Sequence, residues 1–236
     1  MNPLAVVTGG TKGIGKAVIE RFLSGGFDII TCSRDDSELF SLQKEMKDRF
    51  PSSDLFYQEA DLSVRDKLNG FITFIHSFDR SIMVLINNTG VFIPGQVHNE
   101  DEGTLEKTME TNVYSAYHLT RGIIGGMMKE KKGHIFNICS TASIMAYPNG
   151  GSYCISKFAL YGMTKVLREE MKPHQIKVTA VLAGATLTDS WAGTDLPVER
   201  FIDSKDVAEA IWSAYGLSPR AVLEEILIRP QLGDLD

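Results

Sequence analysis

The chain has 236 residues, of which 43% are hydrophobic and 23% charged, a composition typical of a globular protein with one α/β domain. Its formal net charge is −6 and no basic cluster is present, which argues against nucleic acid or an anionic membrane surface as a partner. No apolar run approaches the roughly 18 residues that span a bilayer, and the apolar stretch after Met1 lacks a charged region before it. We therefore expect a cytoplasmic protein.

Three cysteines, Cys32, Cys139 and Cys154, give an odd number without C-x-x-C spacing, which favours neither a disulfide framework nor a zinc site. The histidines are scattered without metal-ligand spacing, so no metal is expected. We interpret the cysteines as small buried side chains. Because Cys139 and Cys154 neighbour Ser140 and Tyr153, a reactive thiol at the site is the alternative.

The first element is a strand followed by a glycine turn. The apolar run from Leu4 to Thr8 predicts a strand, and GGTKGIG and a helical apolar pattern follow it. Strand, glycine turn and helix N-terminus together present backbone N–H groups to a phosphate. The expected dinucleotide contacts in this turn are Gly9, Thr11, Lys12, Gly13, Ile14 and Gly15. An ordinary structural turn is the alternative, because the glycines have GxxxGxG rather than GxGxxG spacing.

The second predicted strand, 27–32, ends in Ser33 and Arg34. An acidic residue near this strand end would hold the ribose 2′-hydroxyl of NAD, whereas an arginine suits a 2′-phosphate. Asp35 and Asp36 come after Arg34, where they are more typical of the start of the next helix. With Lys12 as a second cation, the pattern predicts NADP(H) as the cofactor. A solvated surface Arg34 is the alternative.

Strands and helices alternate through the rest of the chain. Further strands are predicted at 54–60, 82–86, 134–139, 175–182 and 221–228, and helices at 37–50, 64–78, 102–129, 151–171 and 206–215. This alternation predicts an α/β, single-domain Rossmann fold over 1–236, a doubly wound parallel seven-stranded sheet with helices on both faces. Asn112 is a poor residue for a helix interior, which is consistent with a local irregularity at a functional site. The polar segment 186–203 is expected to be a short substrate lid.

The candidate chemistry lies in the run from Asn137 to Lys157. Tyr153 and Lys157 are four residues apart, so on a helix they share one face. A lysine cation beside a phenol favours the phenolate, which makes Tyr153 usable as a general acid or base near neutral pH.

A second YxxxK pair, Tyr161 with Lys165, lies about 12 Å further along the same helix. Thirteen residues before Tyr153 is the hydroxyl of Ser140, whereas thirteen before Tyr161 is Pro148, which has none. We interpret the second pair as a surface or interface pair.

Taken in order, TGGTKGIG, NNTG, Asn112, Ser140 and YCISK resemble the motifs of the short-chain dehydrogenase/reductase family. The C-terminal EEILIRPQLGDLD loosely resembles bacterial sepiapterin-reductase-like members. The resemblance implies that Tyr153 is the proton donor and acceptor and that Ser140 holds and polarises the carbonyl. It also implies that Lys157 binds the nicotinamide ribose and that Asn112 supports a proton-relay water.

The same resemblance implies further cofactor contacts. These are Asp61, Leu62, Asn88, Gly90, Gly184, Thr186 and Thr188, together with Tyr153 and Lys157. The chain departs from the family at Thr89, where NNAG has alanine, and at Ala183, where a proline usually precedes Gly184. The second change puts the rigidity of that loop in doubt.

The function expected from these observations is NADPH-dependent reduction of a small ketone or aldehyde, with a sepiapterin-like substrate. One alternative is a 3-oxoacyl-carrier-protein reductase, although the acidic composition offers no basic dock for an acidic carrier. Another is a non-catalytic NADP-binding regulator, which would not need Tyr153. We also expect a homo-oligomer, a tetramer or a dimer, because the apolar residues of helix 151–171 exceed a single stripe.

Overall fold

The computed structural model describes residues 1–188, 191 and 193–235. Within them, strands pair in parallel in the order β3-β2-β1-β4-β5-β6-β7. The strands are β1 (Leu4–Thr8), β2 (Asp28–Ser33), β3 (Leu55–Glu59), β4 (Ile82–Asn87), β5 (Gly133–Ile138), β6 (Ile176–Ala183) and β7 (Glu225–Ile228). The predicted doubly wound, seven-stranded parallel sheet is confirmed.

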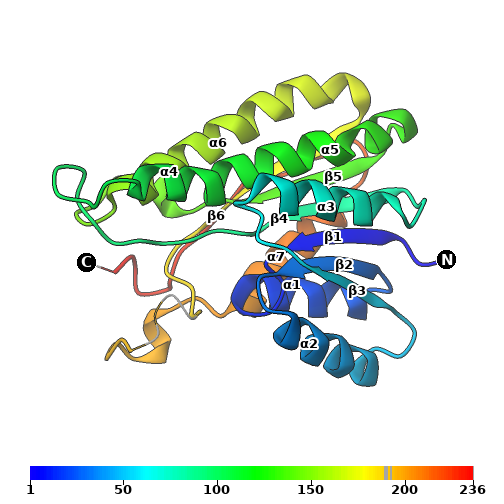
Figure 1. The fold of residues 1–236 in the computed structure, drawn as a ribbon, viewed down its shortest axis with the longest axis horizontal. Coiled ribbons are helices and arrows are strands. Elements are labelled where there is room, and N and C mark those ends of the chain that lie inside the picture. Colours follow the sequence, from blue (N-terminus) through cyan, green and yellow to red (C-terminus); the bar gives the residue numbers. More distant parts are fainter. Residues whose placement is uncertain (189–190, 192, 236) are drawn as a thin grey trace.

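Helices cover both faces of the sheet (Figure 1). The α-helices are α1 (Gly13–Ser24), α2 (Asp36–Arg49), α3 (Arg65–His76), α4 (Thr104–Met109), α5 (Ser115–Glu130), α6 (Gly151–Met171) and α7 (Ser204–Tyr215). The shorter helical turns are the π-helical turn η1 (Glu110–Tyr114) and the 3-10 turns η2 (Thr141–Ser143), η3 (Lys172–His174) and η5 (Val198–Arg200). In Figure 1, α1 and α2 lie below the sheet and α3, α5 and α6 above it, while α7 packs against α1.

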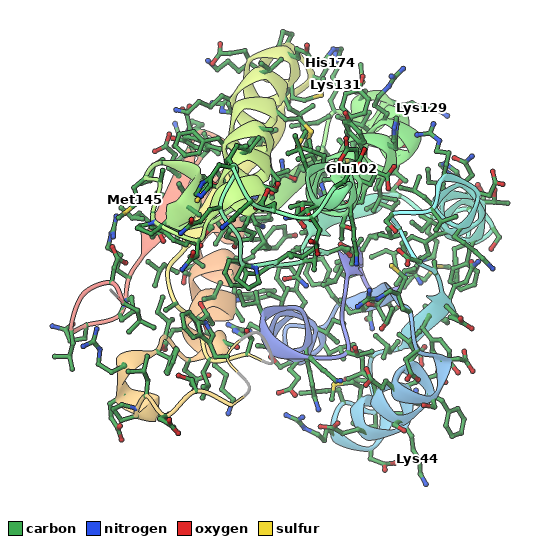
Figure 2. All side chains as sticks on the ribbon, turned by 60° about the vertical axis from the view of Figure 1, so that its left-hand side comes forward. Lys44, Glu102, Lys129, Lys131, Met145 and His174 are labelled. Carbon is green, nitrogen blue, oxygen red and sulfur yellow. The ribbon has the colours of Figure 1, made fainter. Side chains whose placement is uncertain are left out.

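Two apolar layers lie between the sheet and these helices. Alternate residues of β1 enter opposite layers, because successive side chains of a strand point to opposite faces. Ala5 and Val7 join the layer under α1 and α7, whereas Leu4 and Val6 join the layer under α3 and α5. Both faces of β1 are therefore buried, which explains why it is a continuous apolar run. Charged side chains such as Lys44 lie at the periphery (Figure 2).

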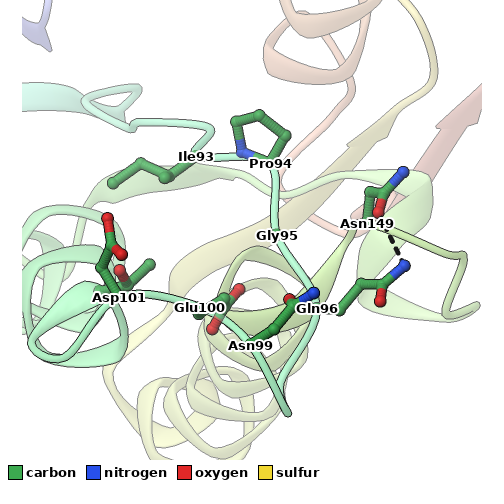
Figure 3. A pocket seen from close by; sticks show the side chains of 9 residues that line it. Ile93, Pro94, Gly95, Gln96, Asn99, Glu100, Asp101 and Asn149 are labelled. Carbon is green, nitrogen blue, oxygen red and sulfur yellow. Dashed lines mark hydrogen bonds between the residues drawn. The ribbon is translucent and has the colours of Figure 1, made fainter.

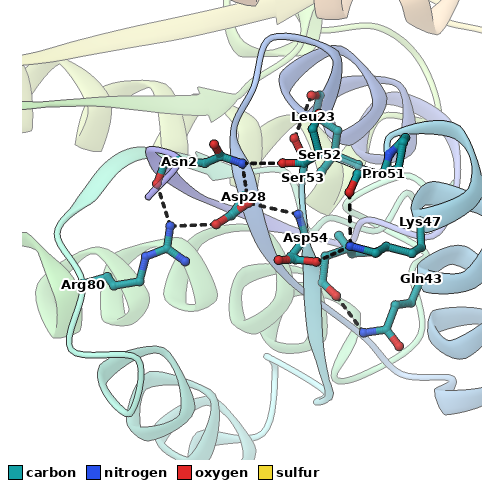
Figure 4. Close-up of polar contacts among 11 residues, drawn as sticks. Asn2, Leu23, Asp28, Gln43, Lys47, Pro51, Ser52, Ser53, Asp54 and Arg80 are labelled. Atoms are coloured by element: carbon teal, nitrogen blue, oxygen red, sulfur yellow. Dashed lines mark hydrogen bonds and ion pairs between the residues drawn. The ribbon is translucent and has the colours of Figure 1, made fainter.

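A polar cluster closes the amino edge of the sheet (Figure 4). The Asp28 carboxylate accepts from Asn2 Nδ2 at 3.0 Å, from the backbone N–H of Asp54 at 3.0 Å and from Arg80 at 2.8 Å. Burial alone would raise the pKa of Asp28, but these hydrogen bonds and the Arg80 charge together lower it. The cluster joins the chain before β1 to the starts of β2, β3 and β4, so the amino edge is a structural region.

The long helix expected over 102–129 is interrupted in the middle. Between α4 and α5, residues Glu110–Tyr114 form a π-helical turn, η1, with Asn112 at its centre. The irregularity expected at Asn112 is confirmed, and π-helical turns are frequent at functional sites.

The last strand is shorter than predicted. Pairing with β6 begins only at Glu225, opposite Ala180. The predicted first residue, Ala221, lies in a turn instead, since its backbone N–H donates to the carbonyl of Ser218. Within the described residues, no helix combines the length and apolar character needed to cross a membrane.

Candidate active site

The Tyr153 and Lys157 pair lies in the first two turns of α6, next to the carboxyl end of β5. Lys157 is only 6% exposed, and its Nζ donates to the carbonyl oxygen of Ile138 at 2.8 Å. The same Nζ lies 5.7 Å from the centroid of the Tyr153 ring. The structure thus places the two side chains on one face, with the lysine cation held on a neutral oxygen near the phenol.

Ser140 lies two residues beyond the end of β5 and is buried. Its Oγ accepts from the backbone N–H of Ala142 at 3.1 Å, while its own N–H donates to Ser143 Oγ at 3.2 Å, so it caps η2. The η2 turn packs against α6. The cap uses an acceptor site of the oxygen and leaves the hydroxyl proton to be donated elsewhere.

Asn112 is fully buried, and both the oxygen and the nitrogen of its side-chain amide form hydrogen bonds. Its Oδ1 accepts from the N–H of Val91 at 2.7 Å, and its Nδ2 donates to the Val91 carbonyl at 3.0 Å and to Ser156 Oγ at 2.9 Å. Ser156 in turn donates to the main-chain carbonyl of Tyr153 at 2.7 Å. A Cβ at Gly90 would lie 3.4 Å from Asn112 Oδ1, so the turn after β4 passes directly beside this group.

The glycine turn after β1 has a backbone that requires glycine. Gly9 and Gly13 have φ values of 65° and 52°, which side chains rarely adopt. A Cβ on Gly15 would lie 2.2 Å from the carbonyl oxygen of Gly9. Asn88 ties this turn to β4, because its Nδ2 donates to the carbonyls of Thr8 at 2.9 Å and Gly9 at 3.0 Å. This close-packed turn before a helix N-terminus fits a dinucleotide phosphate.

The two cations predicted to meet the 2′-phosphate, Lys12 in the glycine turn and Arg34 after β2, have different surroundings. Lys12 Nζ lies 2.6 Å from Glu38 of α2. Arg34 is exposed, and no carboxylate of the described residues lies within ion-pair distance of its guanidinium. Asp35 accepts from the backbone N–H of Glu38 at 3.0 Å and caps α2, so its predicted place at the helix start is confirmed.

The other predicted cofactor contacts of the first half lie at the same edge of the sheet. The hydroxyls of Thr11 and Ser33 are 3.4 Å apart. Asp61 Oδ1 accepts from the Ser63 N–H at 3.0 Å and from its hydroxyl at 2.7 Å, while Leu62 is buried. Ile14 packs against the α1 core layer.

The absence of the family's proline at Ala183 does not leave the turn unsupported. Ala183 is the last residue of β6 and is paired with Ile228 of β7. The next N–H, of Gly184, donates to the carbonyl of Ile228 at 2.8 Å. Backbone pairing with β7 therefore holds the chain where a proline would have restricted it.

Beyond this point the chain returns toward the glycine turn. Thr186 is buried, donates to the Gly184 carbonyl at 3.0 Å and forms a bridge with Ile202. A Cβ on Gly13 would lie 2.8 Å from Thr188 Cγ2, so Thr188 lies close against the glycine turn. Residues 189, 190 and 192 of the expected lid lie outside the described residues.

Phe92 next to the site was not found from the sequence. Its ring meets the Tyr153 ring edge to face, with centroids 5.0 Å apart, and it remains 39% exposed. No spacing rule joins residue 92 to residue 153, because the contact depends on how the loop after β4 folds.

A buried polar chain beneath the site was also missed. Asn87 Nδ2 donates to Asn137 Oδ1 at 2.8 Å, and Asn137 Nδ2 donates to Thr164 Oγ1 at 2.8 Å. The chain links β4, β5 and α6. The signal was an asparagine within each of two otherwise apolar strands, since a buried amide requires a partner.

The cysteines are buried, as expected. Burial raises the pKa of Cys32 to about 12 and that of Cys139 to about 11, which disfavours the reactive-thiol alternative at Cys139. In the part of the chain that the structure describes, no three His, Cys, Asp or Glu side chains are arranged to hold a metal ion.

The second YxxxK pair is tied to another element. The Tyr161 hydroxyl donates to Glu225 Oε1 on β7, and Lys165 Nζ lies 2.8 Å from the same oxygen. Burial first, and then the hydrogen bond to Glu225, raises the pKa of Tyr161. This is the surface-pair geometry expected for Tyr161 and Lys165.

The parallel sheet, the glycine turn and the YxxxK helix define a short chain dehydrogenase. The model of the family described as short chain dehydrogenase matches residues 3–196, so the chain belongs to this family of oxidoreductases. The family and enzyme class predicted from the sequence are confirmed.

The chain is similar over nearly its whole length to several oxidoreductases. The sepiapterin reductase of Chlorobaculum tepidum is 29% identical over 243 residues, covering 100% of this chain and 99% of that protein. The 3alpha-hydroxysteroid dehydrogenase of Mediterraneibacter gnavus is 27% identical, covering 89% of this chain and 88% of that one. A metagenomic short-chain oxidoreductase in complex with NADP has a TM-score of 0.84 and 27% identity, with 97% of each chain covered.

Proposed function

We propose that the chain reduces the carbonyl of a small ketone or aldehyde with NADPH. The observation that carries the proposal is the placement of Tyr153 in the first turn of α6, with the buried Lys157 cation 5.7 Å from its ring. A cation there stabilises the negative charge that develops on the tyrosine oxygen as its proton is transferred. Bound NADPH would supply the hydride.

In this proposal, each side chain of the site has one task. Tyr153 donates its proton to the carbonyl oxygen, and Ser140 donates a hydrogen bond that holds and polarises the same oxygen. Lys157 holds the nicotinamide ribose. The Asn112 amide is engaged by Val91 and Ser156, so its support for a relay water would come from the main chain of η1.

The proposed preference for NADPH rests on Arg34. Its guanidinium is exposed at the end of β2, whereas Lys12 is paired with Glu38. An arginine suits the 2′-phosphate that distinguishes the two coenzymes. The NADP complex of the metagenomic relative supports the same choice.

The test is kcat/KM for NADPH and NADH with one fixed carbonyl substrate. A charge-assisted hydrogen bond contributes about 1.5–3 kcal/mol, so Arg34→Ala is expected to lower NADPH efficiency roughly 10- to 100-fold. NADH efficiency should change little. Arg220→Ala, an exposed arginine before β7, is the matched control and should leave both values unchanged. Equal loss for both coenzymes would refute the assignment of Arg34.

We propose a sepiapterin-like substrate, supported by the full-length similarity to a sepiapterin reductase. Residues 186–203 would form the lid over it; the rings of Trp191 and Phe201 within that segment are 5.1 Å apart. NADPH oxidation should be fastest with sepiapterin in a panel that includes diacetyl, a 3-oxosteroid and a 3-oxoacyl thioester. The highest efficiency with the thioester would favour the 3-oxoacyl-carrier-protein reductase instead. No turnover together with tight NADPH binding would favour the regulator.

We also propose a homo-oligomer, a tetramer or a dimer. The proposal is supported by large apolar side chains exposed on the outer surfaces of α5 and α6. They are Tyr117, Ile155, Phe158 and Val166. A monomer mass by light scattering at micromolar protein would refute it.

A further inference from the structure

The start of α6 is capped by a carboxylate from a distant loop. Gly150, the residue before the helix, has no side chain to cap it. Instead, Glu100 from the loop between β4 and α4 accepts from the backbone N–H of Ser152 through Oε1 at 2.8 Å. Its other oxygen accepts from the Ser152 hydroxyl. One carboxylate therefore binds the residue directly before Tyr153 with both of its oxygens.

The space for this carboxylate is left by two glycines. A Cβ on Gly151 would lie 2.0 Å from Glu100 Oε1, and a Cβ on Gly95 would lie 2.6 Å from Glu100 Cγ. Any other residue at either position would displace the carboxylate or the loop. The close approach of Glu100 to the start of α6 thus depends on glycine both in its own loop and in the helix.

The two loops are also joined beside the carboxylate. Gly95 forms a bridge with Gly150, and its N–H donates to the Asn149 carbonyl at 3.0 Å. Gln96 Nε2 donates to Asn149 Oδ1 at 3.1 Å, the bond drawn in Figure 3. Gly95, Gln96 and Asn149 line a pocket of about 350 Å³ together with Glu100. The loop is therefore held against the helix start at Gly95 and Gln96 as well as at Glu100.

A negative charge at this place stabilises the first turn of a helix. The first backbone N–H groups of an α-helix have no partner within the helix, and the helix dipole places positive potential there. Tyr153 lies in this turn, between two residues that are held by hydrogen bonds. Glu100 holds Ser152 on one side, and Ser156, itself bound by Asn112, holds the Tyr153 carbonyl on the other.

We propose that Glu100 is a positioning residue that fixes the Tyr153 hydroxyl for proton transfer by holding the first turn of α6. The inference rests on the proposed function, in which Tyr153 donates the proton. If the turn frays, the tyrosine loses its alignment with the substrate oxygen while the cofactor turn at β1, on separate elements, stays intact.

The decisive variant is Glu100→Ala, assayed with NADPH and a carbonyl substrate. A misplacement of about 1 Å can lower the rate roughly 100-fold, so we expect kcat to fall about 10- to 100-fold. The dissociation constant of NADPH, measured by its fluorescence, should stay within about twofold, because most residues proposed to bind it, in the glycine turn and at Arg34, lie on other elements and Lys157 stays anchored on the Ile138 carbonyl. The effect of D₂O on kcat should increase, because a poorly aligned proton transfer becomes rate-limiting. A purely structural role would not raise this isotope effect.

Two further variants separate geometry from charge. Glu100→Gln keeps an oxygen for the Ser152 N–H and a donor for its hydroxyl, so it should recover most of the kcat lost in Glu100→Ala. Ser152→Ala removes only the hydroxyl contact and should lower kcat less; in the Glu100→Ala background it should add nothing, since both act through one contact. The single variant Ser152→Ala also tests the proposal by itself if Glu100→Ala does not fold. Additive effects of the two substitutions would overturn the proposal.

Glu102→Gln is the matched control, since Glu102 is an exposed carboxylate two residues along the same loop (Figure 2). It should keep wild-type kcat and isotope effect. Wild-type kcat in Glu100→Ala, or a parallel loss of kcat and NADPH binding, would refute the positioning role. If Tyr153→Phe also keeps its turnover, the proposed function fails; if Tyr153→Phe is inactive and Glu100→Ala is normal, only this inference fails.

Discussion

The helix α6 carries the same Tyr-x-x-x-Lys spacing twice, two turns apart, in different surroundings. Lys157 is buried and donates to a neutral carbonyl, so its positive charge is not cancelled by its partner. Lys165 is exposed and shares the carboxylate of Glu225 with Tyr161. The spacing sets which side chains share a face, but the neighbouring strand determines what they can do.

The contrast extends to the charged groups beside each tyrosine. Glu225 raises the pKa of Lys165, while burial and Glu225 raise that of Tyr161. Tyr161 is thus held in its protonated form by an acceptor that is already charged. No carboxylate of the described residues forms an ion pair with Lys157. Three experiments test this difference.

The largest effect is expected from the two tyrosines. Tyr153→Phe keeps the ring that packs on Phe92 but removes the proton, so kcat should fall by at least about 100-fold with NADPH binding retained. Tyr161→Phe should stay within about twofold of wild type, because its hydroxyl donates to a surface carboxylate on β7, two turns from the site. Steady-state kinetics of both variants decide the matter; the reverse order of effects would mean that the wrong tyrosine has been assigned.

The lysines should differ in the same direction, with a smaller separation. Lys157→Ala leaves the Ile138 carbonyl without its donor and removes the cation near Tyr153, so we expect kcat/KM to fall about 10- to 100-fold and stability to fall by about 1–3 kcal/mol. Lys165→Ala removes an exposed ion pair and should change stability by less than about 1 kcal/mol. Kinetics and urea unfolding measure both. Similar losses in the two variants would abolish the distinction.

The smallest effect concerns the titration of Tyr161. The pKa of Tyr161 in the folded protein lies above its ordinary value. The contribution of this hydroxyl to folding stability is therefore fully present below the unfolded pKa of about 10, and it is lost as the pH rises through the folded pKa. Glu225→Gln removes the charge and should shift the titration downward. The measurement is the ultraviolet absorbance of the phenolate in wild type, Glu225→Gln and Tyr161→Phe. A titration unchanged by Glu225→Gln would show that burial alone raises this pKa.

The sequence was most informative where one element contains the whole signal. The glycine turn, the YxxxK helix and the irregularity at Asn112 each depend on local spacing or propensity, and the structure has them where predicted. Contacts between elements were not predictable in this way. Glu100 and Ser152 are 52 positions apart, and no local pattern marks a glutamate that caps another helix. The start of β7 was predicted too early because strand length depends on the partner strand.

The π-helical turn changes the direction in which the side chains of α5 point relative to those of α4. Each residue of an α-helix advances the face by about 100°, so the extra residue in η1 rotates α5 by about that angle relative to α4. The rotation lets α4 pack on α6 while α5 packs on α3 and β4. Deleting one residue from 110–114 would restore a regular helix, but it would also remove the rotation of α5 relative to α4. Either Asn112 would then turn away from Val91, or Leu119 and Ile123 would turn away from the sheet.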